Sequence, residues 1–143
     1  MDERTSTGRR DRGRLEALLA THGILATTQR LRIAELLFAR NQHQTAEQVF
    51  RELARMGTPV ARATVYNTLN LFAARGLIKA LAMDPECCQF DSNTEPHHHI
   101  YYEDTGEVAD IPAGQLQIGR MPELPPELEA RAVDVVVRVR RRA

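Results

Sequence analysis

Three consecutive histidines, His97, His98 and His99, are the residues of this chain whose type and spacing point most directly to chemistry. On an extended strand the side chains of His97 and His99 lie on one side, with Cα atoms about 6.5–7 Å apart. Two imidazoles at that spacing can bind one ion, while His98 faces the other way. A site with both imidazole nitrogens and carboxylate oxygens as ligands suits Fe²⁺, Mn²⁺ or Zn²⁺. An accessible imidazole can also ligate haem iron.

Carboxylates close to the histidines in sequence are the candidate oxygen ligands: Asp91, Glu95, Glu103, Asp104, Glu107 and Asp110. The histidine run has other interpretations, a chance surface feature or a proton-sensitive patch, because imidazole titrates near neutral pH. A hydrolytic zinc enzyme would need an open coordination position and a glutamate placed as base. The sequence has no His-Glu-x-x-His motif, no Ser/His/Asp arrangement and no glycine-rich phosphate loop. We therefore do not expect an enzyme.

The two cysteines, Cys87 and Cys88, are neighbours in the sequence. A disulfide between neighbours is strained, so we expect reduced thiols, in agreement with a reducing compartment. Without a Cys-x-x-Cys pair, a four-thiolate zinc site is not available. We expect the two thiols to be buried, and a thiolate haem site at either one is the alternative.

Charge divides the chain into two halves of opposite sign. Residues 1–79 carry 13 Lys and Arg against 7 Asp and Glu, and residues 80–143 carry 6 against 12. A basic first half predicts a polyanionic partner, and an acidic half with histidines predicts a cation. Chance segregation of surface charge is the other interpretation. The polar start of the chain does not resemble a secretory signal, and no apolar run reaches the roughly 20 residues that span a bilayer. We expect a cytoplasmic protein with no membrane partner.

The first half is typical of helices followed by a hairpin. We predict a flexible arm over residues 1–12, helical spacing from Leu15 up to Gly23, and a polar break at residues 41–44. Thr45-Ala46-Glu47-Gln48 is a capping box, in which Thr45 begins a helix. Further predicted elements are a helix after Thr27 and Thr28, a helix over 62–75 that ends at Gly76, and strands over 77–82 and 87–91. Short helices followed by a β-hairpin indicate a winged helix-turn-helix.

The second half is typical of a small sheet. Residues 92–97 are the predicted hinge, and strands are expected over 99–103, 107–111 and 132–140, the last from the alternation of Val133, Val135, Val137 and Val139. A three-stranded sheet with an exposed apolar face is barely stable alone. We therefore expect a homodimer. The predicted fold is α+β, with a winged helix-turn-helix domain over 1–91 and a small α/β dimerisation and metal-sensing domain over 98–143.

The helix over 62–75 is the best candidate for reading DNA. Opposite its apolar stripe it carries Arg62, Thr64, Tyr66 and Asn67, which can reach phosphates, thymine methyls and base edges in a major groove. Arg30, on an earlier helix, would bind the flanking backbone. The other interpretation is an ordinary solvated helix face.

With these features together, the chain resembles the ferric uptake regulator (Fur) superfamily from about residue 15 to 142. The motifs that carry the resemblance are Thr28-Gln29-Arg30, His43-Gln44-Thr45-Ala46-Glu47, Ala63-Thr64-Val65-Tyr66-Asn67-Thr68-Leu69, Gly76-Leu77-Ile78, His97-x-His99 and Gly106-Glu107-Val108. Within the superfamily the chain is most similar to the iron response regulators (Irr). The shared features are Pro96-His97-His98-His99, the proline-rich stretch over 121–126 and the closing segment over 133–141.

The resemblance implies a hinge metal site and a set of ligands. Carried over by motif, the metal ligands fall on His43, Asp91, His97, His99 and Asp110. The Irr branch also implies control by haem, for which His97, His98 and His99 are the candidate ligands. Many family members hold a structural zinc with Cys-x-x-Cys pairs. The first such pair falls on Tyr102 and Thr105 here, so we expect no four-cysteine structural zinc.

The implied function is a regulator of iron or haem metabolism that binds a palindromic, A/T-rich double-stranded operator as a homodimer. The alternative within the same fold is a peroxide- or metal-sensing repressor, in which oxidation or loss of metal releases DNA. A metal-delivery protein is the non-regulatory alternative. That alternative predicts no salt-dependent affinity for DNA, whereas a regulator should lose affinity steeply as salt rises.

Overall fold

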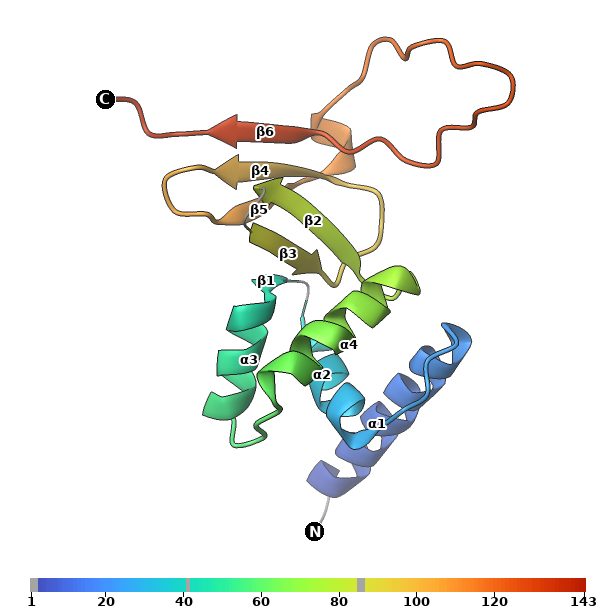
Figure 1. Cartoon of the computed structure of the whole chain (residues 1–143), viewed down its shortest axis with the longest axis vertical. Helices are drawn as coiled ribbons and strands as arrows, with labels where there is room; N and C mark the ends of the chain where they lie inside the picture. The colour runs from blue at the N-terminus through green and yellow to red at the C-terminus, as the bar shows by residue number, and fades with distance from the viewer. Residues whose placement is uncertain (1–2, 41, 85–86) are drawn as a thin grey trace. The chain divides into compact units, whose positions relative to one another are not determined.

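The computed structural model describes residues 3–40, 42–84 and 87–143, and it divides into two compact units, Met1–Thr94 (unit 1) and Glu95–Ala143 (unit 2). In the described residues, unit 1 forms four α-helices and a three-stranded sheet, and unit 2 forms a second three-stranded sheet (Figure 1). This order confirms the α+β prediction of a winged helix-turn-helix followed by a small sheet domain.

The first helix is longer than the sequence analysis predicted. α1 (Glu3–Thr21) includes most of the stretch expected to be a flexible arm. Arginine and glutamate are good helix formers, and Arg12 and Glu16 form an ion pair of 3.6 Å at the i,i+4 spacing. The helix therefore extends beyond the residues that have an apolar face. It ends before Gly23, whose φ of 69° is the left-handed conformation favoured at such ends.

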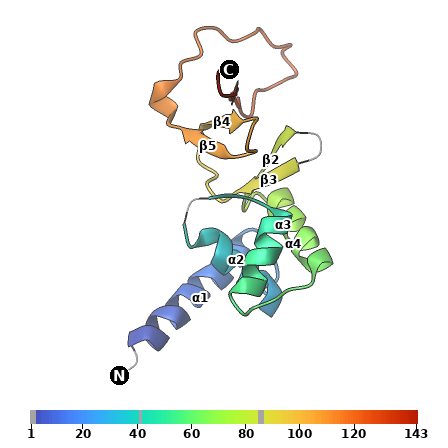
Figure 2. The ribbon, with the colours of Figure 1, turned by 90° about the vertical axis from the view of Figure 1, so that its left-hand side faces the viewer.

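The other helices of unit 1 follow the predicted pattern. They are α2 (Thr28–Phe38), α3 (Ala46–Arg55) and α4 (Arg62–Ala74), and α3 and α4 lie against each other (Figures 1 and 2). Their inner faces make one core, in which the most fully buried side chains are Phe72, Leu19, Ile33, Leu37, Leu53, Leu69, Val49 and Val65. None of the helices in the described residues is long and apolar enough to cross a membrane.

The start of α3 is fixed by the predicted capping box. The Thr45 hydroxyl accepts the Gln48 N–H at 3.1 Å, and Gln48 Oε1 accepts the Thr45 N–H at 2.8 Å. At the other end of α3, hydrogen bonds from Arg55 hold the pKa of Glu52 below its usual value. The point at which α3 begins therefore depends on local contacts that the sequence specifies.

The sheet of unit 1 contains a strand that the sequence analysis did not predict. β2 (Lys79–Asp84) and β3 (Cys87–Asp91) form the expected hairpin, and β1 (His43–Thr45) pairs with the other side of β3, giving the order β1-β3-β2. Both pairings are antiparallel. Residues 43 and 44 were expected in a polar break. A three-residue strand has too few residues to show a period of two, so only its pairing with β3 defines it.

The prediction of buried cysteines is wrong for Cys88, which is exposed on β3. Its neighbours on the strand, Gln89 and Phe90, are buried. The side chain of Cys87 lies outside the described part of the chain. Adjacent residues of a strand point to opposite faces of the sheet, and so the adjacency of the two cysteines could not by itself predict burial of both.

Unit 2 is a sheet of order β5-β4-β6, built from β4 (His98–Tyr102), β5 (Val108–Ile111) and β6 (Val136–Val139), with a short 3₁₀ turn, η1 (Ala113–Gln115), after β5. β5 is antiparallel to β4, and β6 is parallel to it. β6 is shorter than the predicted strand over 132–140, because its partner β4 offers only five residues for pairing.

Few apolar side chains of unit 2 are buried. Among residues 95–143, all of which are described, the buried hydrophobic residues are Tyr101 and Ile111. The large apolar side chains left exposed are Tyr102, Ile118, Met121, Leu124, Leu128, Val133, Val136 and Val137. The exposed apolar surface expected from the sequence is therefore present.

Thr45→Ala tests whether the capping box stabilises unit 1. Loss of the hydroxyl leaves the Gln48 N–H without its acceptor, so the free energy of unfolding should fall by about 0.5–2 kcal/mol. Urea denaturation measures the change. Thr28→Ala is the matched control, because Thr28 is exposed on α2 and should shift stability by less than about 0.5 kcal/mol. Equal effects of both substitutions would contradict a capping role.

Candidate functional site

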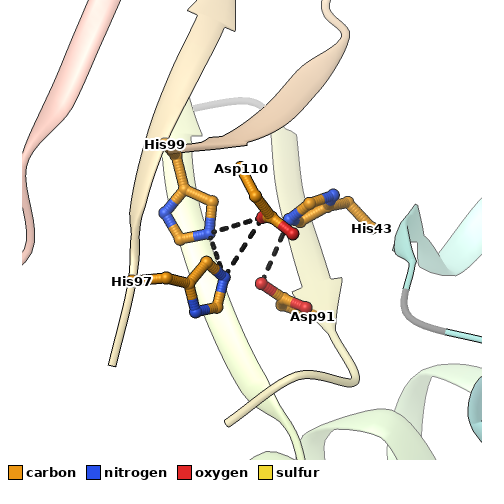
Figure 3. Close-up of side chains that lie close together, drawn as sticks. All are labelled: His43, Asp91, His97, His99 and Asp110. Carbon is orange, nitrogen blue, oxygen red and sulfur yellow. Dashed lines mark hydrogen bonds and ion pairs between the residues drawn. The ribbon is translucent and has the colours of Figure 1, made fainter. Parts of the chain in front are cut away.

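Three of the predicted metal ligands meet in unit 2. His99 on β4 lies directly opposite Asp110 on β5 in the antiparallel register, and His97 precedes β4. The Nε2 atoms of His97 and His99 are 2.9 Å apart, and Asp110 Oδ1 lies 3.2 Å from His97 Nε2 and 3.6 Å from His99 Nε2 (Figure 3). The expectation that His97 and His99 share one side therefore agrees with the geometry of unit 2.

The three separations match the edges of a coordination polyhedron. Ligands held at about 2.1 Å from an ion are about 3.0 Å apart in an octahedron and about 3.4 Å apart in a tetrahedron. His97 and His99 are buried, with exposed fractions of 8% and 0%, whereas the Asp110 side chain is 39% exposed. Two imidazoles and one carboxylate form a donor set that fits Fe²⁺, Mn²⁺ or Zn²⁺.

A backbone contact indicates which ring nitrogen of His97 carries a proton. Its Nδ1 lies within hydrogen-bond distance of the Glu95 carbonyl oxygen, which can only accept, so Nδ1 carries the proton. In a neutral imidazole the other nitrogen is then unprotonated, and in His97 that is Nε2, the atom that faces His99 and Asp110. Such a second contact orients metal-binding histidines and selects the ligating nitrogen.

The two remaining predicted ligands form a pair in unit 1. His43 on β1 lies opposite Asp91 on β3 in register, with His43 Nε2 3.1 Å from Asp91 Oδ2 (Figure 3). Asp91 is fully buried, and its Oδ1 accepts the Asn93 N–H at 2.9 Å. A buried carboxylate needs such partners, because leaving water without them costs several kcal/mol.

Residues next to this pair hold β1 against β3. The Gln42 side-chain amide donates to the carbonyls of Leu36 and Leu37 at the end of α2, at 2.6 and 3.1 Å. The Gln42 N–H donates to the Ser92 hydroxyl, and the Ser92 N–H donates to the Gln42 carbonyl, both at 3.3 Å. These positioning contacts were not predicted, since Gln42 and Ser92 are 50 residues apart.

His98, a predicted haem ligand, has a different role from its neighbours. Its Nδ1 accepts the Val135 N–H at 3.1 Å, which joins β4 to the residue before β6. A neutral imidazole that accepts at Nδ1 carries its proton on Nε2, so neither nitrogen offers a lone pair in this arrangement. The contact therefore disfavours His98 as an iron ligand.

Three of the predicted DNA-binding residues line one hollow on unit 1. Arg30 from α2 and Thr64 and Asn67 from α4 contribute to a cavity of about 240 Å³. The Arg30 guanidinium also donates to the Leu25 carbonyl at 2.7 Å, which holds the side chain in place. Tyr66, a fourth predicted residue, is 43% exposed on α4. This polar hollow and the tyrosine beside it in sequence form the candidate reading surface.

Arg62, the fifth predicted DNA-binding residue, is held by α3. Its guanidinium forms an ion pair with Glu47, which also pairs with Arg51 at 3.2 Å, and it lies 4.3 Å from the centre of the Phe50 ring. Stacking of this kind adds about 0.5–1 kcal/mol at exposed sites. Arg62 therefore joins α3 to α4, a role that sequence reasoning missed because Glu47 is 15 residues away.

Known proteins resemble this chain in sequence. The family model described as "Ferric uptake regulator family" matches residues 21–123. The chain belongs to the ferric uptake regulator family. Peroxide-responsive repressors named PerR are similar to it. The protein from Staphylococcus aureus strain Mu50 is 34% identical over 70% of this chain and 68% of the relative, and that from Staphylococcus epidermidis is 33% identical over 70% and 67%.

Solved structures of ferric uptake regulators share the fold. The Pseudomonas aeruginosa regulator, determined with manganese, is 26% identical, with a TM-score of 0.70 over 90% of this chain and 98% of the other. The Vibrio cholerae regulator is 22% identical, with a TM-score of 0.69 over 87% and 98%. The family is thus shown by sequence, and the arrangement of elements by structure.

Asp110→Asn tests the donor set of unit 2. The substitution removes an anionic oxygen from beside two buried imidazoles, so the affinity for Mn²⁺ or Zn²⁺ should fall by at least about tenfold. Isothermal titration of the full chain measures it. Glu107→Gln is the control, since it removes an equal charge at an exposed position just before β5. Equal losses in both variants would show that general charge, not ligation, accounts for the effect.

Proposed function

We propose that this protein is a metal-responsive, DNA-binding transcriptional regulator that senses iron or manganese. The observation that carries the proposal is the donor cluster of His97, His99 and Asp110, whose three atoms are spaced as ligands of one ion. Membership of the ferric uptake regulator family supports it independently. The similar Pseudomonas aeruginosa regulator was determined with manganese, one of the ions that this donor set suits.

The sensed ion, in this proposal, has five ligands: His43, Asp91, His97, His99 and Asp110. The resemblance to the family supplies this set, and chemistry supports it. Unit 1 and unit 2 each contain a histidine and an aspartate that face each other on neighbouring strands. In each pair the distance from the imidazole nitrogen to the carboxylate oxygen is close to the distance between two ligand atoms of one ion. An ion that takes ligands from both sides of the hinge over 92–97 would restrict the movement of unit 1 relative to unit 2. Metal binding would then affect how the reading surface of unit 1 meets DNA.

Iron and haem homeostasis is the regulatory role that we propose, by resemblance to the Irr branch. In favour are the Pro96–His99 run and the closing valine–arginine segment. The tautomer implied for His98 favours a small cation over haem at this run. Haem is therefore a separate effector to be tested beside the metal ions.

A peroxide-responsive repressor is the second candidate function. The similar Staphylococcus proteins are named for that response, at 34% and 33% identity. In this case the ion would serve to detect the oxidant, and peroxide treatment of the metal-loaded protein would release DNA. Metal binding alone does not separate the two candidates, whereas peroxide treatment does.

DNA recognition is proposed for α4, with Thr64, Tyr66 and Asn67 towards the bases and Arg30 towards the backbone, and with Arg62 beside them at the first turn. We propose a homodimer that binds a palindromic, A/T-rich operator, because two-fold protein symmetry matches two half-sites. The exposed apolar side chains of unit 2 support the dimer, since a small sheet of this kind gains stability when a second copy covers it.

His43→Ala tests whether both units bind the same ion. With one shared ion, titration should give one metal per chain, and His43→Ala should lower its affinity without changing that stoichiometry. His22→Ala is the control, because His22 lies in unit 1 outside the proposed set and contacts the Leu18 carbonyl. Two metals per chain in the wild type, with His43→Ala losing one, would refute a shared ion.

Operator binding in defined states tests the function itself. Fluorescence anisotropy with a Fur-type palindrome and a scrambled duplex should show metal-dependent, sequence-selective binding, measured without metal, with Mn²⁺, with Fe²⁺, with haem, and with Fe²⁺ followed by peroxide. Tyr66→Ala should weaken operator binding in each state in which the wild type binds, and it should leave metal affinity unchanged, because its side chain is exposed on α4.

Each outcome has a separate meaning. Release by haem alone supports the Irr-like role, and release by peroxide alone supports the second candidate. Metal dependence with neither effect indicates a regulator that responds to the ion itself. Equal, metal-independent affinity for both duplexes would contradict the regulator and leave a metal-delivery protein as the better description.

A further inference from the structure

Unit 2 ends in a basic segment that neither the metal site nor the reading surface uses. Residues 138–142, the arginine segment, contain Arg138, Arg140, Arg141 and Arg142. They are four of the six arginines in residues 95–143, a unit that otherwise carries nine Asp and Glu residues. Such a local concentration of positive charge in an acidic unit is typical of a surface that binds a polyanion.

The arginine segment is held in a defined place on the sheet. Val139 is the last residue of β6, and its carbonyl accepts the Glu103 N–H at 2.9 Å. One residue beyond Arg140, the Arg141 N–H donates to Asp104 Oδ2 at 2.9 Å. Figure 1 shows the chain continuing from β6 to its C-terminus. These contacts reduce the conformational entropy that the segment would lose on binding.

The guanidinium group of one of the four arginines contacts side chains of its own unit, and those of the other three are exposed. Arg138 lies 5.2 Å from the Tyr101 ring centre and forms an ion pair of 3.7 Å with Glu103, so its charge is engaged within the unit. Arg140, Arg141 and Arg142 are exposed. No carboxylate among the described residues lies within ion-pair distance of these three guanidinium groups.

We propose that Arg140, Arg141 and Arg142 bind backbone phosphates of the DNA held by the same protein. The inference rests on the proposed function. Guanidinium groups match phosphate oxygens in charge and can bind them through two hydrogen bonds. Because unit 1 is joined to unit 2 by the chain, binding of unit 1 to DNA presents the arginine segment to the duplex at high effective concentration. This favours DNA over a separate anionic partner.

The interaction would be independent of DNA sequence. Phosphates carry no base information, so the arginine segment should add affinity equally to an operator and to a scrambled duplex. Each neutralised phosphate releases counterions and contributes about 0.9 to the slope of log affinity against log salt. The contribution of the arginine segment to DNA affinity should therefore depend on salt concentration and should be the same for every DNA sequence.

The test is the triple substitution Arg140→Gln, Arg141→Gln and Arg142→Gln in the full chain with Mn²⁺. Arg138 is left in place, because it packs on Tyr101. Anisotropy between about 50 and 200 mM salt should give a slope that is smaller by about 0.9 for each phosphate that the variant no longer neutralises. Affinity for operator and scrambled duplex should fall by the same factor, and Mn²⁺ affinity and thermal midpoint should stay unchanged.

Arg120→Gln with Arg131→Gln is the matched control, as both arginines are exposed in unit 2 outside the arginine segment. A smaller loss of affinity per charge in this control supports the proposal. Equal loss per charge would assign the effect to long-range electrostatics and overturn it. An unchanged slope in the triple variant would also overturn it, while leaving wild-type operator binding, and hence the proposed function, intact. Absence of DNA binding by the wild type would refute both together.

Discussion

A fully buried carboxylate, that of Asp91, is the constraint on which the sheet of unit 1 depends. Burial without partners would cost several kcal/mol. The Asn93 N–H meets part of this demand, and the His43 imidazole lies within ion-pair distance of the carboxylate. The strand β1 places His43 opposite Asp91. The reciprocal bonds of Gln42 and Ser92, and the Gln42 amide on the end of α2, keep that strand in register. The edge strand β1 is thus positioned next to the buried carboxylate of Asp91.

In unit 2, polar site residues are buried as well, and there they make up much of the core. Its buried side chains are Tyr101, Ile111 and the two imidazoles His97 and His99, so site residues occupy much of what serves as a core. Binding of the proposed metal ion would also stabilise such a unit, because the ligands are organised only in the folded state. β4 links the parts, since His99 faces Asp110 and Tyr101 faces Arg138. β4 therefore carries His99 of the proposed sensing site and pairs with β6, the strand on which the arginine segment begins.

The features that the sequence determined are those set by neighbours a few residues apart. The capping box of Thr45 and Gln48 acts across three residues, and the ends of α1 and α4 follow from Gly23 and Gly76. The hairpin of β2 and β3 lies close to its predicted bounds, and the strand period of two is why His97 and His99 could be expected on one side. The zero net charge carried no such information until the halves were counted separately.

Tertiary structure decided whatever depends on residues that are far apart in the chain. The pairing of β1 with β3, the parallel pairing of β6 with β4, and the ion pair of Arg62 with Glu47 each join segments whose local sequences contain no sign of the partner. The same holds for the Val135 contact that sets the tautomer of His98. Local patterns record the periodicity and end signals of one element, whereas register and side-chain partners are selected by the packing of several elements at once.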